Sequence, residues 1–92
     1  MTLHDTIDNM TSSDYKARFK AEYYQTKIRY EKLKAFNTKI EAADRVHCFG
    51  EKQKIEAPKH DCPAELLVEQ QNIMGRYLHI LEVRAVIEGI DL

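Results

Sequence analysis

Two histidine–cysteine pairs flank one stretch of the sequence, and they are the residues best suited to metal or thiol chemistry. They are His47-Cys48 and His60-x-Cys62. Four nitrogen and sulfur ligands can hold a structural zinc ion, but adjacent ligands rarely bind one metal together, and the sequence has no CxxC or HxxxH spacing. The alternatives are a disulfide between the two cysteines and a Cys–His nucleophile without a recognisable oxyanion hole. We expect partly buried free thiols, no bound metal and no cofactor.

Residues 14–45 combine positive charge with tyrosine. This segment has nine basic and five acidic residues, a net charge of +4, although the whole 92-residue chain has a net charge of −1. Lys20, Lys27 and Lys34 repeat every seven residues and therefore share one side of a helix. Cations bind phosphate groups and tyrosine stacks on bases, so the combination suits a nucleotide-like anion. The alternative is that the basic residues form the solvated side of a long helix and the tyrosines lie in its packing seam.

A glycine and a histidine mark a second candidate region, residues 75–79. Arg76 and His79 are three residues apart and therefore neighbours on a helix. Gly75 costs a helix interior about 1 kcal/mol relative to Ala. Its presence indicates that another helix or a ligand approaches the backbone there, or that the glycine is tolerated at the surface. We expect a positive pocket where the lysine row meets the same row, Arg76 or Arg84 of a neighbouring subunit. The candidate ligand-binding residues are Lys20, Tyr24, Lys27, Arg29, Arg76, Tyr77 and His79.

The elements that must position these residues are helices. The chain has only three Gly and two Pro, and 32% of its residues are charged, a composition that favours long helices in one small domain. Thr11 and Asp14 have the spacing of a capping box, and Gly89 is a natural helix end. We predict a single all-α domain with a short helix over 2–10, a helix over 12–45, a connection over 46–61 and a helix over 62–88. The two long helices would form an antiparallel hairpin.

The helix faces predict more packing than one hairpin can provide. One seam of the first long helix should pack on the second: Phe19, Tyr23, Thr26, Tyr30, Leu33, Asn37 and Ile40. A second stripe consists mainly of small residues. It reflects either the preference of alanine for helices or a packing surface between subunits: Ala17, Ala21, Tyr24, Ile28, Ala35 and Ala42. The later helix carries a heptad stripe, Leu66, Ile73, Ile80 and Ile87, and an adjacent inner stripe, Leu67, Met74, Leu78, Leu81 and Ala85. Because each helix has one main neighbour, we expect a homo-oligomer. The alternative is a compact three-helix monomer with exposed apolar surface.

The sequence shows neither a membrane span nor a signal peptide. It has no apolar run of 18 residues, and its first ten residues lack a basic region followed by an apolar core. We therefore expect a soluble cytoplasmic protein that does not act at a membrane.

Residues 61–92 resemble the small phage and prophage proteins named after a crAssphage early gene. The shared features are Asp61-Cys62-Pro63, Glu65-Leu66-Leu67, Gln70, Met74-Gly75, Tyr77-Leu78, Leu81-Glu82, Arg84-Ala85 and Ile87-Glu88. Residues 12–36 are similar to the first helix of that family at Tyr15, Arg18, Phe19, Glu22 and Tyr30-Glu31-Lys32-Leu33. The resemblance covers most of the chain except residues 1–11 and 46–60, and it implies a phage origin in an infected bacterial host.

The predicted helical plan is similar to that of oligomeric phage sponges, the anti-CBASS and anti-Thoeris proteins that sequester nucleotide immune signals. By this architectural analogy we expect an anti-defence protein that holds a cyclic oligonucleotide or an ADP-ribose isomer between subunits without cleaving it. The alternative is an inhibitor or adaptor that binds a host defence protein or a nucleic-acid-handling protein. An enzyme is not expected, because paired carboxylates, a P-loop, GxGxxG and HExxH are absent from the sequence. Direct DNA binding is disfavoured by the net charge.

Overall fold

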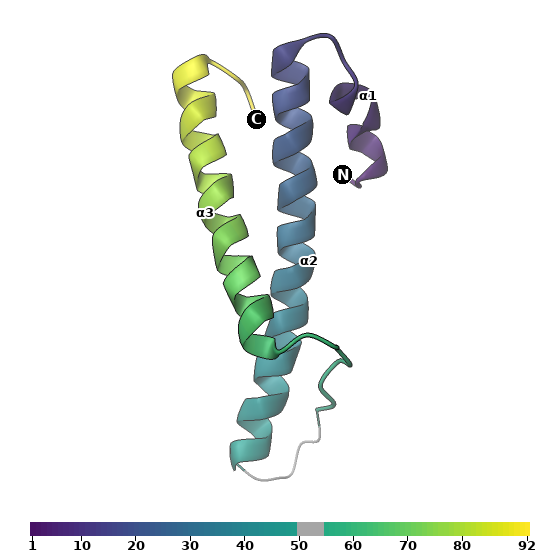
Figure 1. Ribbon diagram of the computed structural model, residues 1–92, viewed down its shortest axis with the longest axis vertical. Helices are drawn as coiled ribbons and strands as arrows, with labels where there is room; N and C mark the ends of the chain where they lie inside the picture. Colours follow the sequence, from purple (N-terminus) through teal and green to yellow (C-terminus); the bar gives the residue numbers. More distant parts are fainter. Residues whose placement is uncertain (50–54) are drawn as a thin grey trace.

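The protein is an antiparallel helical hairpin with a short helical segment on one side (Figure 1). The computed structural model describes the backbone of residues 1–49 and 55–92, and the side chains of residues 1–46 and 55–92. The elements are the 3-10 turn η1 (His4–Thr6), and the helices α1 (Ile7–Met10), α2 (Tyr15–Phe49) and α3 (Ala64–Glu88). These described residues contain no strand, so the all-α prediction is confirmed. The molecule is elongated, with extents of 54 × 25 × 21 Å.

The helix ends differ from the predicted bounds by a few residues. Helix α2 begins at Tyr15 because the Asp14 carboxylate accepts a hydrogen bond from the Lys16 backbone N–H at 3.1 Å, as an N-cap does. It continues to Phe49, so residues 46–49 belong to the helix and not to the connection. Helix α3 ends at Gly89, whose positive φ of 70° is the left-handed conformation of a C-cap glycine.

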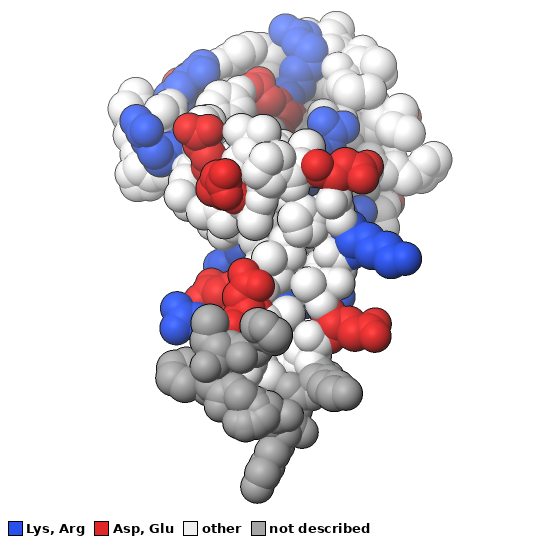
Figure 2. Space-filling view, turned by 60° about the horizontal axis from the view of Figure 1, so that its bottom comes forward, with Lys and Arg blue, Asp and Glu red and all other residues white. Residues whose placement is uncertain are grey.

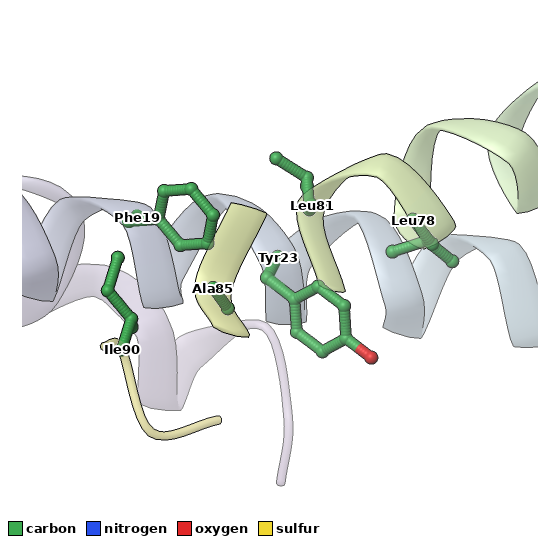
Figure 3. Packing of buried hydrophobic residues seen from close by; sticks show 6 residues of the cluster. All are labelled: Phe19, Tyr23, Leu78, Leu81, Ala85 and Ile90. Carbon is green, nitrogen blue, oxygen red and sulfur yellow. The ribbon is translucent and has the colours of Figure 1, made fainter. Parts of the chain in front are cut away.

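The core lies between α2 and α3 towards the end of the hairpin that holds both termini (Figure 1). Phe19 and Tyr23 from α2 pack with Leu78, Leu81 and Ala85 from α3, and Ile90 folds back onto them (Figure 3). Leu81 is the most buried large side chain, at 1% exposure. The α2 seam and the inner stripe therefore meet in the hairpin as predicted.

The segment η1–α1 packs on another side of α2. The Gln25 side-chain amide of α2 donates a hydrogen bond to the Thr6 hydroxyl at 3.0 Å, and Thr6 is buried. On the same side of α2, Ala21 is also buried. The N-terminal segment therefore occupies part of the surface that the small-residue stripe was considered to offer to another subunit.

The heptad stripe of α3 lies outside the hairpin. Ile73 is 57% exposed, Ile80 54% and Ile87 77%, and Leu66 is half exposed. The hairpin was predicted to leave part of the apolar surface of α3 uncovered, and the exposed heptad stripe is that surface. Of the helices that the structure describes, none combines the length and the apolar character needed to cross a bilayer.

Candidate functional site

A groove runs between α2 and α3 beside Gly75, and we call it the Gly75 groove. Its volume is about 650 Å³, within the range of ligand pockets, and it is open to solvent. Tyr30 lines it from α2, and six residues line it from α3: Gln71, Asn72, Gly75, Arg76, His79 and Ile80. The groove therefore combines an aromatic ring, two amide side chains, an arginine and a histidine.

Gly75 is explained by the approach of Tyr30. A Cβ atom added at Gly75 would lie 3.2 Å from Cε1 of Tyr30 and 3.5 Å from its hydroxyl. The 3.2 Å contact is tighter than ordinary side-chain packing, so a larger residue would require the ring to shift. The expectation that another helix approaches the backbone at Gly75 is confirmed, since the approaching atoms belong to a side chain of α2.

Two lysines of α2 lie over tyrosine rings, and two basic side chains of α3 line the groove itself. The ammonium group of Lys34 lies 5.9 Å from the centre of the Tyr30 ring, and that of Lys27 lies 5.8 Å from the Tyr23 ring. Both distances are typical of cation–π contacts. Arg76 and His79 add two side chains on α3, and both are exposed. The groove is thus suited to an anion with a flat, stackable group.

Positive charge is not gathered into one patch on the face that Figure 2 shows. Basic and acidic side chains are interspersed there, with no continuous basic surface. A site for one small anion fits this distribution better than a track for a nucleic-acid strand does.

The carboxylate of Glu82, also on α3, lies close to His79. The Tyr23 hydroxyl donates a hydrogen bond of 2.5 Å to Oε2 of Glu82, and Oε1 of Glu82 lies 3.9 Å from Nδ1 of His79. Burial, and then the hydrogen bond to Glu82, raise the pKa of Tyr23 to about 12, so its hydroxyl keeps its proton at neutral pH.

The other predicted ligand residues do not share the groove within one chain. Tyr24 and Lys27 line a separate pocket of about 400 Å³ that also includes Met1 and Ile28. The Tyr24 hydroxyl donates a hydrogen bond to the backbone carbonyl of Leu92.

Three further predicted residues lie outside both pockets. Lys20 is half-buried and lies two helix turns before Lys27, while Arg29 is exposed and faces a different side of α2. Tyr77 is 39% exposed beside the heptad stripe. Of the seven predicted residues, only Arg76 and His79 line the Gly75 groove.

Sequence reasoning missed four of the groove residues as ligand contacts. Tyr30 was assigned to the hairpin seam and Ile80 to the heptad stripe, and each also faces the groove. Gln71 and Asn72 carry no spacing signal, because amides are common on exposed helix surfaces. The feature of the sequence that indicated the groove was Gly75 itself. Glycine destabilises a helix interior, so its presence there predicted a close neighbour.

The described residues hold no cluster of three His, Cys, Asp or Glu side chains that is arranged to bind a metal ion. Cys62 is a free thiol and is exposed, so its expected partial burial is wrong. It lies in the turn before α3, where its backbone carbonyl is 2.6 Å from Nδ1 of His60, whose ring lies edge-on to Phe36 of α2. The side chains of His47 and Cys48 lie outside the described residues.

The fold and the groove define a helical-hairpin protein suited to holding a small ligand. The family profile of Sequestin matches residues 13–87, which include nearly all of both long helices, and the chain belongs to the Sequestin family. The family name refers to sequestration, in agreement with the expected sponge-like class. No curated protein and no solved structure gives a significant match to the chain.

Proposed function

We propose that the protein is a phage anti-defence sponge that sequesters an anionic nucleotide signal, a cyclic oligonucleotide or an ADP-ribose isomer, without cleaving it. The observation that carries the proposal is the Gly75 groove. Arg76 and His79 can bind phosphate oxygens there, Tyr30 can stack on a base, and Gln71 and Asn72 can hydrogen-bond base edges. The family name supports sequestration as the activity.

The binding site is proposed to lie between subunits of a homo-oligomer. Ile80 belongs to both the heptad stripe and the lining of the groove. A second chain that covers the stripe would therefore form a wall of the groove as well. It would also exclude water, which strengthens the ion pairs made to a bound phosphate.

The test is isothermal titration calorimetry of the wild-type protein against cyclic dinucleotides, cyclic trinucleotides and ADP-ribose isomers. We expect tight binding of at least one compound, and recovery of that compound intact by chromatography after denaturation of the protein. Arg76→Gln should weaken binding by roughly tenfold or more, because it removes a charged hydrogen bond to phosphate. Lys39→Gln, at an exposed position on another side of α2, removes the same charge away from the groove and should bind as the wild type does. Absence of heat with every compound, or recovery of a cleaved product, would contradict the proposal.

A second candidate function is inhibition of a host protein. The exposed heptad stripe favours it, because an apolar helix face is a common docking surface for a partner helix. Size-exclusion chromatography with light scattering distinguishes the two candidates. A monomer that gains a defined host partner in a pull-down supports the inhibitor, and a homo-oligomer that binds a nucleotide supports the sponge.

A further inference from the structure

Tyr23, Glu82 and His79 form a line of contacts from the buried core to the Gly75 groove. Tyr23 is 5% exposed, and its hydroxyl donates the 2.5 Å hydrogen bond to one oxygen of Glu82. The second oxygen of Glu82 faces Nδ1 of His79 at 3.9 Å. This hydrogen bond from the core holds the carboxylate, whose side chain is 50% exposed, and the carboxylate faces the histidine that lines the groove.

The charges around this line explain why it matters for an anion. A fixed carboxylate next to a phosphate site repels the ligand unless a cation lies between them. His79 lies beside the Glu82 carboxylate and also lines the groove. Arg76 also lines the groove from α3, whereas Lys27 and Lys34 lie over tyrosine rings of α2 and line other pockets.

We infer that Glu82, held by Tyr23, is a positioning residue for His79. It attracts the Nδ1 side of the imidazole and thereby leaves Nε2 to face the groove. In this orientation Nε2 is the ring nitrogen that a ligand in the groove would meet. This last step rests on the proposed function, whereas the orientation of the ring does not.

The orientation is tested without any ligand. Long-range proton–nitrogen NMR spectra at a pH where histidine is neutral report which ring nitrogen carries the proton, and His79→Gln assigns the signal. We expect the Nδ1–H form to predominate at His79 in the wild type, because the negative charge of Glu82 favours a proton on the ring nitrogen that it faces. Glu82→Ala should shift the population towards Nε2–H, and Tyr23→Phe should do so in part, because it releases the carboxylate. Glu56→Gln, at an exposed position outside the helices, is the control and should leave the spectrum unchanged. Equal populations in the wild type and Glu82→Ala would overturn the inference.

Discussion

Single residues set the shape of the groove, and the pair Tyr30 and Gly75 sets it most directly. Two effects oppose each other in Gly75→Ala. Alanine favours the helix by about 1 kcal/mol over glycine, while its Cβ would lie 3.2 Å from Cε1 of Tyr30. Overpacking a filled site typically costs about 1–3 kcal/mol, so we expect Gly75→Ala to lower the free energy of unfolding or leave it unchanged.

The sign of this effect should reverse when the ring is removed. In a Tyr30→Leu background, Gly75→Ala should raise the free energy of unfolding by up to about 1 kcal/mol, because only the helix preference remains. Urea denaturation of the four proteins of this double-mutant cycle measures the coupling. Identical effects of Gly75→Ala in both backgrounds would show that Tyr30 does not explain the glycine.

A second prediction at this scale concerns acid. The Tyr15 hydroxyl donates a hydrogen bond of 2.9 Å to Glu88, and this bond, with a smaller contribution from Arg84, holds the pKa of the Glu88 carboxyl below its ordinary value of 4.5. A lowered pKa in the folded state means that stability is present above pH 4.5 and is lost as the pH falls through the folded-state pKa. Tyr15→Phe should therefore lose less stability between pH 5 and pH 3 than the wild type does.

Thermal melts at half-unit pH intervals measure this difference. The pKa of Asp5 is also lowered, chiefly by its hydrogen bond from the Thr2 backbone, so some acid sensitivity should remain in Tyr15→Phe. Wild type and variant with parallel stability curves over this window would mean that the Tyr15–Glu88 bond does not persist in solution.

At the scale of whole elements, α3 has two apolar stripes and only one of them enters the hairpin. Leu81 of the inner stripe is 1% exposed, while its chain neighbour Ile80 of the heptad stripe is 54% exposed. We predict that Leu81→Ala costs about 2–5 kcal/mol of unfolding free energy, through lost burial and a residual cavity. For a domain of this size that is a large fraction of the total stability. Val86→Ala, at a position that is 84% exposed, is the control. It should change stability by less than about 0.5 kcal/mol in the same urea experiment.

These elements also show what sequence can and cannot predict. Periodicity identified both stripes of α3 and the α2 seam, since helical spacing alone determines which residues share a face. The place of Arg76 and His79 next to Tyr30 depends instead on the register of α2 against α3, which no local pattern fixes. Helix ends were predicted only to within a few residues. Several polar residues near Asp14 could also act as the N-cap, so the sequence did not determine which of them begins α2.

The scale of the whole molecule decides whether the groove is complete in one chain. The heptad stripe exposes isoleucine side chains along most of α3, on a face that no described segment of the chain covers. Exposed apolar side chains repeated along one helix face are stabilised by association, because burial removes them from water. We predict that the wild type is a homo-oligomer at micromolar concentration.

The double variant Ile73→Glu/Ile80→Glu tests this prediction. Both side chains are more than half exposed in the single chain, so the hairpin should keep its helical circular dichroism. A carboxylate buried at a subunit interface without a partner is strongly unfavourable, so the variant should elute as a monomer in size-exclusion chromatography with light scattering. Val86→Glu adds a carboxylate at an exposed position outside the heptad stripe, and it should retain the wild-type mass. A monomeric wild type, or a double variant with unchanged mass, would contradict assembly through the stripe. If Ile73→Glu alone, which changes no residue of the groove lining, is a folded monomer and has also lost its nucleotide ligand, the second chain contributes to the site and not only to stability.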